Sequence, residues 1–388
     1  MENASIKKFY KFLTTDILTI VEILQEHKRK VYIVGGAIRD YYFNEPINEV
    51  DFDIATDATP DEITKWMTEV GIKVKSIGEN YGTLLVIVKK KAFEVSTLRR
   101  EVFESPGVPP KVSFVENIEE DLDRRDFKFN AIVFDVTTKE FSDKYNGLED
   151  IEQFRISMIG NAEERLREDG LRIIRLARFA SKYHLEIDQE LITALEKIGE
   201  AVKFRNPVAL QIEFFKLLLL PNPAFGLKLL FRYNILKALF PSLSFYAREP
   251  KETVDIKKIE QYLDRIKEIP SRSESVRFFF LLKVLSQKNE LSKDLLLQIS
   301  KDFKLSEKLM QTLVRLVQSW TDFPHNLDLK TLKRWIRATG INASEDLLPF
   351  IFLDAEISGK SDILSNQESF LHESQKIIQS FRNIGISP

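Results

Sequence analysis

The pattern of apolar and polar positions changes near residue 140, and the two sides predict different kinds of structure. Before this point, short runs rich in β-branched and aromatic residues alternate with turn signals, which is typical of strands. We expect strands at Lys30–Val34, Val50–Ile54, Lys73–Ile77, Thr83–Val88, Phe93–Thr97 and Ala131–Asp135. Helices are expected before and between them, at Ser5–Glu26, Ala37–Phe43 and Asp61–Val70. Thr59 and Pro60 mark the start of the last helix, because threonine caps a helix and proline suits its first turn.

After residue 160 no stretch has a convincing strand pattern. Apolar residues recur at spacings of three and four, which predicts amphipathic helices. These helices include Glu163–Tyr183, Gln189–Ile198 and Pro207–Leu220. The sequence therefore predicts an α+β fold, in which a mixed first domain precedes a long helical remainder.

Composition excludes several classes of protein. The 388 residues are 44% hydrophobic, which is enough for real cores and argues against disorder. They include no cysteine, which excludes disulfides, thiolate zinc sites, iron–sulfur clusters and a cysteine nucleophile. The formal net charge of −2 does not exclude a nucleic-acid partner, because it is an average. The segment 165–182 is locally basic, with Arg165, Arg167, Arg172, Arg175, Arg178 and Lys182.

The expected location is a reducing compartment, the cytoplasm, with the protein soluble there. The longest apolar runs are far shorter than the roughly 20 residues that span a bilayer. Acidic residues among the first 26 argue against a signal or transit peptide.

A glycine pair provides the first candidate for chemistry. Gly35 and Gly36 fall where a strand is followed by a helix, and they would let backbone N–H groups approach a phosphate closely. Glycine pairs at strand ends are also common as simple turns, so this motif alone leaves both interpretations open.

Asp51 and Asp53 lie in a strand-like run, so their side chains face the same side. Two neighbouring carboxylates repel each other unless a cation lies between them, and Mg²⁺ favours carboxylates together with substrate phosphates. The alternative is a solvated strand face. The nearby glycine pair favours phosphoryl-type transfer. Glu94 is either a third carboxylate of this site or a charge on an exposed face.

The segment Arg124–Ala131 is a more specific signal. Arginine suits triphosphate oxygens, since its planar fork donates two hydrogen bonds at once. Asp126 could accept from ribose hydroxyls, and Asn130 could donate or accept. The alternative is a charged connection with Arg–Asp pairs at the surface.

A third candidate lies in the arginine-rich helix. Asp169 and Arg172 are three residues apart, so they would be neighbours on one helix face. An acceptor beside donors complements cytosine and adenine, which both present an amino donor next to a ring-nitrogen acceptor. Uracil and guanine reverse this order and would be rejected. The alternative is an ordinary surface salt bridge.

These motifs, in this order, resemble the bacterial-type (class II) tRNA nucleotidyltransferase and poly(A) polymerase family, within the polymerase-beta-like nucleotidyltransferases. The matching motifs are Gly35-Gly36-x-x-Arg39-Asp40 with Asp51-x-Asp53, Arg124-Arg125-Asp126-x-x-x-Asn130-Ala131, Asp143-x-x-x-Gly147-x-x-Asp150, and Glu168-Asp169-x-x-Arg172 continuing through Arg175 and Arg178. The resemblance implies a polymerase-beta-like nucleotidyltransferase head (residues 1–140) followed by an all-helical neck (141–200), body (201–255) and tail (256–388).

The resemblance also implies roles for individual residues. Asp51 and Asp53 would bind two Mg²⁺ ions. Asp169 and Arg172 would act as an amino-acid template for the incoming base, with Glu168 orienting Arg172. The expected nucleotide-binding residues are Gly35, Gly36, Arg39, Arg124, Asp126, Asn130, Glu168, Asp169, Arg172, Arg175 and Arg178.

The expected function is template-independent addition or repair of the 3′-terminal CCA of tRNA from CTP and ATP. A loop at Glu101–Lys111, where the family has a flexible loop, favours CCA addition. An A-adding enzyme, a poly(A) polymerase and an inactive RNA-binding scaffold are the alternatives. The protein would bind the 3′ end and the acceptor and elbow region of tRNA. The tail would have a structural role or dock the elbow, with Lys330, Lys333, Arg334 and Arg337 as candidate phosphate contacts.

Overall fold

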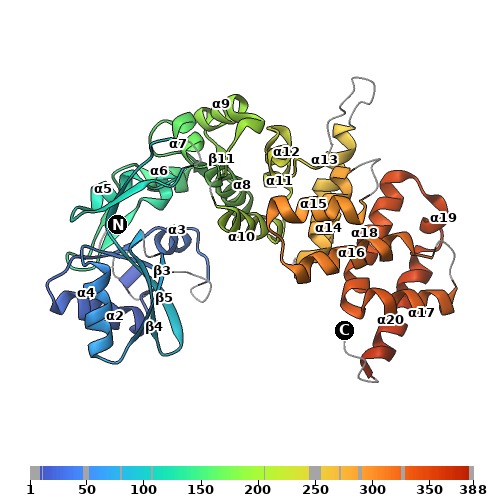
Figure 1. Ribbon diagram of the computed structural model, residues 1–388, viewed down its shortest axis with the longest axis horizontal. Coiled ribbons are helices and arrows are strands. Elements are labelled where there is room, and N and C mark those ends of the chain that lie inside the picture. The colour runs from blue at the N-terminus through green and yellow to red at the C-terminus, as the bar shows by residue number, and fades with distance from the viewer. Residues whose placement is uncertain are drawn as a thin grey trace. The chain divides into compact units, whose positions relative to one another are not determined.

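The computed structural model describes residues 9–10, 12–46, 52–78, 81–105, 108–204, 206–243, 255–270, 272–286, 291–324 and 328–383. The chain forms two compact units (Figure 1). Unit 1 consists of Met1–Arg172 and Tyr183–Lys197, and unit 2 of Ile173–Lys182 and Ile198–Pro388. The α+β expectation is confirmed, because the first unit contains a sheet and the second is helical. The division into head, neck, body and tail remains a prediction.

Unit 1 is built on a seven-stranded sheet with strand order β3-β4-β5-β2-β1-β8-β9. The strands are β1 (Val31–Val34), β2 (Asp53–Thr56), β3 (Lys73–Gly78), β4 (Thr83–Val88), β5 (Lys91–Thr97), β8 (Val133–Asp135) and β9 (Glu140–Ser142). Among the described strand pairs of this sheet, β2 and β5 are parallel and the others are antiparallel. The six expected strands are present, with bounds shifted by a few residues. The additional strand β9 is too short to give an alternating pattern.

Helices cover this sheet. Contacts with it come from α2 (Thr15–Glu26) and α4 (Pro60–Glu69), and α5 (Ile118–Asp123) packs through Ile118 and Leu122 on Tyr32, Val34 and Ala55. Thr59 caps α4 in a capping box with Glu62, and Pro60 begins the helix, as the sequence predicts. The short helix α3 (Gly36–Tyr42) follows β1 directly.

A hairpin replaces part of the expected loop at Glu101–Lys111. Strand β6 (Arg99–Val102) pairs antiparallel with β7 (Lys111–Phe114), so both ends of this segment are strand. Residues 106 and 107 lie outside the described residues. The apolar and polar pattern did not predict β6 because three of its four residues are charged. These charged side chains form ion pairs, so the strand shows no alternation of apolar and polar positions.

The region after the sheet is not purely helical, which corrects the all-helical neck. Strands β10 (Arg155–Ile156) and β11 (Glu186–Ile187) form a short parallel ladder. The expected helix Glu163–Tyr183 is two helices, α7 (Ala162–Glu168) and α8 (Leu171–Tyr183). Periodicity continues across the break because Leu166 and Ile173 are both buried. The other elements here are η3 (Lys128–Asn130), α6 (Gly147–Glu152) and α9 (Gln189–Ile198).

Unit 2 is helical around an aromatic core. Phe214, Phe240, Phe278 and Phe303 contact one another at ring-centroid distances between 5.1 and 6.3 Å. The elements are η4 (Gly199–Ala201), α10 (Pro207–Leu218), α11 (Ala224–Arg232), α12 (Ile235–Leu239), α13 (Ile256–Arg265), η5 (Ile266–Glu268), α14 (Glu274–Ser286), α15 (Lys293–Phe303), α16 (Glu307–Thr321), α17 (Leu329–Thr339), α18 (Ile341–Ser358), α19 (Ser361–Leu364) and α20 (Gln367–Asn383). Within the described part of the chain, no helix combines the length and apolar character needed to cross a membrane.

Candidate active site

The end of β1 brings the first two motifs together. Gly35 has a φ of +66°, which favours glycine, and α3 begins at Gly36. A Cβ added at Gly35 would lie 3.1 Å from Arg125 Nη1 and 3.2 Å from Asp53 Oδ2. The missing side chain at Gly35 therefore lets a carboxylate and a guanidinium group approach the same stretch of backbone.

Asp53 is the described member of the predicted carboxylate pair, and Asp51 lies outside the described residues. Asp53 on β2 pairs in register with Glu94 on β5, so both side chains lie on the same face of the sheet. Asp53 is partly buried and Glu94 is exposed. Within the described ranges no cluster of three or more metal-ligating side chains occurs. The oxygen donors of Asp53 and Glu94 nevertheless suit a hard divalent cation.

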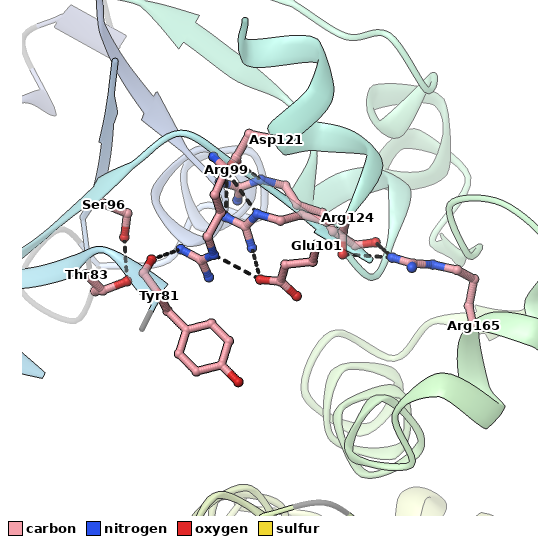
Figure 2. A network of polar contacts seen from close by, with 9 residues as sticks. Tyr81, Thr83, Ser96, Arg99, Glu101, Asp121, Arg124 and Arg165 are labelled. Atoms are coloured by element: carbon pink, nitrogen blue, oxygen red, sulfur yellow. Dashed lines mark hydrogen bonds and ion pairs between the residues drawn. The ribbon is translucent and has the colours of Figure 1, made fainter. Parts of the chain in front are cut away.

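Asp121 in α5 anchors two consecutive arginines, of which Figure 2 labels Arg124. Its Oδ1 accepts from Arg124 Nε and Nη2 at 2.9 and 2.7 Å, and its Oδ2 accepts from Arg125 Nη2 at 3.0 Å. The Asp121 side chain is only 1% exposed. Burial alone would raise the pKa of this carboxyl, but Arg124 and Arg125 outweigh burial and lower its pKa below the usual value.

The two arginines have different surroundings. Arg124 also pairs with Glu101 at 3.4 Å, and Glu101 in turn pairs with Arg99 at 2.9 Å. Arg125, which was not among the expected site residues, is the arginine beside Gly35. Its signal in the sequence is the spacing of three and four residues from Asp121 to the two arginines, which places all three side chains on one side of a helical turn.

Buried polar contacts fix Asp126 and Asn130. Asn130 Nδ2 donates to Asp126 Oδ1 at 2.8 Å, and Arg39 Nη1 donates to Asn130 Oδ1 at 2.7 Å. Arg39 also donates to Asp40 at 2.8 Å and to the hydroxyl of Tyr183 at 3.2 Å. Arg39 is 8% exposed and orients Asn130 through these internal contacts, and its expected contact with nucleotide remains a prediction.

The expected base-reading residues differ in their placement. Arg172 Nη1 donates to Glu168 Oε2 at 2.9 Å, which is the contact expected of these two residues. Asp169, however, terminates α7 in an extended conformation, with φ of −147°, and its Oδ1 accepts from the backbone N–H of Leu171. Asp169 and Arg172 are therefore not neighbours on one helix face, because the chain leaves the helix between Glu168 and Leu171.

Arg175 and Arg178 belong to unit 2 and form a separate cluster. Arg178 Nε donates to Glu213 Oε2 at 2.7 Å, and Arg175 lies 3.7 Å from Glu213 Oε1. Burial would raise the pKa of Glu213, but Arg178 and Arg175 outweigh it, and the pKa is lowered. Glu213 thus holds both arginines, and their expected contact with nucleotide remains a prediction.

Two family models match the chain. Residues 31–157 match a model described as the poly(A) polymerase head domain. Residues 184–246 match a model described as a probable RNA- and SrmB-binding site of polymerase A. The first match includes the motifs from Gly35 to Asp150, the second includes Glu213, and the motif at Glu168–Arg178 lies outside both.

Solved structures with a similar fold include CCA-adding enzymes. The Bacillus stearothermophilus enzyme in complex with CTP has a TM-score of 0.69 and 24% identity, covering 94% of this chain and 82% of that one. The Thermotoga maritima enzyme complexed with tRNA has a TM-score of 0.62 and 18% identity, covering 98% of this chain and 85% of that one. At these identities the similarity establishes the fold.

Curated relatives are CCA-adding enzymes as well. The Staphylococcus saprophyticus enzyme is 39% identical over 199 residues, which are 51% of this chain and 48% of the relative. The Enterococcus faecalis enzyme is 32% identical over 293 residues, which are 74% of this chain and 66% of the relative. The chain thus spans between about half and two thirds of these relatives' length. Together with the ordered motifs, these matches establish that the chain belongs to the bacterial-type CCA-adding enzyme and poly(A) polymerase family.

Proposed function

We propose that this protein adds or repairs the 3′-terminal CCA of tRNA, using CTP and ATP and no nucleic-acid template, in the cytoplasm. The observation that carries this proposal is the meeting of Asp53 and Arg125 at Gly35. A carboxylate suited to a cation and a guanidinium suited to a phosphate both lie close to the backbone at Gly35, which a triphosphate could approach.

In this reaction the RNA 3′-hydroxyl attacks the α-phosphorus of the nucleotide, and pyrophosphate leaves. Asp53 and Asp51, with Glu94 as a further carboxylate, would hold two Mg²⁺ ions, which supply activation of the hydroxyl and neutralisation of phosphate charge. Arg125 would bind triphosphate oxygens, held in place by Asp121. Asp126, oriented by Asn130, would accept a hydrogen bond from a ribose hydroxyl.

Base selection would rest on Arg172 and Asp169. Arg172 is held by Glu168 and is 7% exposed at its side chain, so its direction is fixed before a nucleotide arrives. Asp169 lies in the extended junction between α7 and α8 and not on a helix face. It would contact the base from this junction. Together they would supply an acceptor and donors to the base edge, matching cytosine and adenine and leaving uracil unpaired.

CCA addition is favoured over A-only addition and poly(A) synthesis by the β6–β7 hairpin and by the names of the relatives. The guanidinium of Arg172 lies 5.5 Å from the ring centroid of Phe103, which directly follows β6. The segment expected to correspond to the family's flexible loop therefore contacts the base-reading arginine. The inactive-scaffold alternative does not account for Asp53 and Arg125 at Gly35.

The tail would dock the elbow of tRNA through four candidate cations, which lie three and four residues apart on α17. Lys333 and Arg337 lie over the ring of Phe381 at 5.7 and 5.4 Å, whereas Arg334 lines a groove between α16 and α17 with Arg315. These side chains are exposed at the surface of unit 2, where phosphate contacts would position an RNA helix without reading its sequence.

The test uses tRNA substrates that end at the discriminator base, at C or at CC, each with CTP, ATP or both, and reads product length on a denaturing gel. Three nucleotides followed by a stop are expected. A single A on the CC substrate alone would make the protein an A-adding enzyme. Long A tails would make it a poly(A) polymerase, and no addition to any substrate would favour the scaffold.

A further inference from the structure

Arg165, in α7, contacts both the segment Arg124–Arg125, which is proposed to bind the triphosphate, and Glu168, which holds the base-reading Arg172. It belongs to none of the motifs discussed above. Its Nη2 donates to the backbone carbonyl oxygens of Arg124 and Arg125 at 2.7 and 2.8 Å (Figure 2). Its Nη1 donates to Glu168 Oε2 at 2.7 Å. The planar guanidinium group of Arg165 therefore binds both the backbone at Arg124 and Arg125 and the carboxylate of Glu168.

The contact continues to the base-reading arginine. Glu168 Oε2 accepts from Arg165 Nη1 and, at 2.9 Å, from Arg172 Nη1. Arg172 Nη1 also donates to the carbonyl oxygen of Arg165 at 2.6 Å. Side chain and main chain of Arg165 thus contact both partners of the Glu168–Arg172 pair, and all these residues belong to unit 1.

The Arg165 side chain is largely buried, so few other residues could take its place. The Arg165 side chain is 13% exposed, and its Nε is buried with no hydrogen-bond partner among the described residues. Burial lowers the pKa of Arg165, and the neighbouring Arg172 lowers it further. A lysine could keep the charge, but it lacks the fork that bonds carbonyls and carboxylate at once.

We propose that Arg165 is a positioning residue that sets the distance between phosphate binding and base reading, and that it thereby determines the preference for CTP over UTP. The proposal rests on the proposed function. CTP and UTP have the same triphosphate and ribose, and they differ in the hydrogen-bonding pattern of the base. Discrimination between them therefore requires that Arg172 stay fixed relative to the anchored triphosphate, whereas binding of the triphosphate does not.

The test compares Arg165→Gln and Arg165→Lys with Arg167→Gln in the full-length protein. Arg167 lies on the same helix, is 41% exposed and pairs with Glu163, so it is a matched surface control. We would measure kcat/KM for CTP and UTP on a tRNA that ends at the discriminator base, inhibition by pyrophosphate, and Tm. For both Arg165 variants the ratio of kcat/KM for CTP to that for UTP should fall about tenfold or more, since uracil is no longer rejected.

Pyrophosphate inhibition separates positioning from a general structural role. Asp121 still holds Arg125 in the Arg165 variants, so the inhibition constant should change by less than about twofold. The Arg167 variant should match the wild type in every readout. An unchanged CTP-to-UTP ratio would overturn the proposal, as would parallel losses with both nucleotides and pyrophosphate alongside a lowered Tm. If Arg165→Gln does not fold, Arg165→Lys decides. A wild type that adds no nucleotide to any tRNA would refute the proposed function itself.

Discussion

Replacing Gly147 with alanine should displace the turn that carries Asn130. Gly147 is the first residue of α6, and its N–H donates to Asp143 Oδ1 at 2.7 Å. A Cβ at this position would lie 2.3 Å from the carbonyl oxygen of Lys128, 2.7 Å from its carbonyl carbon and 2.8 Å from Phe129 Cα. All three atoms belong to the backbone of η3, so the clash with the new methyl group cannot be relieved by a change of side-chain rotamer. The backbone itself must move.

The size of the effect follows from these distances. Ordinary contact begins near 3.4 Å, so α6 and η3 must separate by about 1 Å. Overpacking of this kind costs about 1–3 kcal/mol, and the better helix propensity of alanine offsets less than about 1 kcal/mol of it. Because η3 ends at Asn130, which orients Asp126, we also expect KM for CTP to rise about tenfold.

Differential scanning calorimetry and steady-state kinetics measure the two effects. Tm should fall by about 5 °C for a unit of this size. Gly71→Ala is the control, since its Cβ meets nothing within 4 Å and only its φ of +79° is strained. The control should lose stability without a change in KM for CTP. Wild-type Tm and KM in Gly147→Ala would refute the steric reasoning.

Three further predictions follow from other contacts. Asp53→Asn should abolish nucleotide addition while tRNA affinity stays within about twofold, measured by filter binding, since the carboxylate acts on the reacting groups and not on RNA docking; turnover at the wild-type rate would exclude Asp53 from the reaction. Asp121→Asn should lower the free energy of unfolding by about 3–5 kcal/mol at pH 7, because it leaves two arginines without their buried partner. The pKa of Asp121 is lowered on folding, so its stabilisation is present above about pH 4, the unfolded value, and is lost as the pH falls through the folded value; urea titrations at several pH values should show wild type and variant converging in acid, and a constant difference would contradict this. Arg277→Met in α14 should destabilise unit 2 by about 2–4 kcal/mol in thermal unfolding, because the buried guanidinium donates to the carbonyl oxygens of Leu218, Leu220 and Ile269, and a Tm equal to that of the wild type would show that these carbonyls do not need it.

The sheet was predictable where strands bury an apolar face. Strand β4 has the bounds Thr83–Val88 that its pattern predicts, with alternate residues buried. Strand β6 was not predictable in this way, since Arg99 and Glu101 are stabilised by partners distant in sequence such as Arg124 and Asp121. Hydrophobic periodicity reports burial against a core and carries no information on such ion pairs.

In the site too, contacts between residues close in sequence were predictable, and contacts between residues far apart in sequence were not. The contact between Glu168 and Arg172 was predictable because four residues separate them, whereas the break at Asp169 was not, since apolar spacing continues through it. Arg165 was noted only as part of a basic segment, and its contacts were not predictable because its main partners are backbone carbonyls 40 and 41 residues earlier in the chain. Every residue has a carbonyl group, so the sequence gives no sign of which ones a guanidinium will reach.

The path of α8 has a consequence for how the protein is made. The chain enters unit 2 at Ile173, returns to unit 1 at Tyr183, and supplies β11 and α9 before it enters unit 2 again at Ile198. Strand β10 therefore cannot pair with β11 until the whole of α8 has been synthesised. During translation, unit 1 is completed only after a helical segment of unit 2 has emerged from the ribosome. No single cut of the gene yields two fragments that each encode one unit whole.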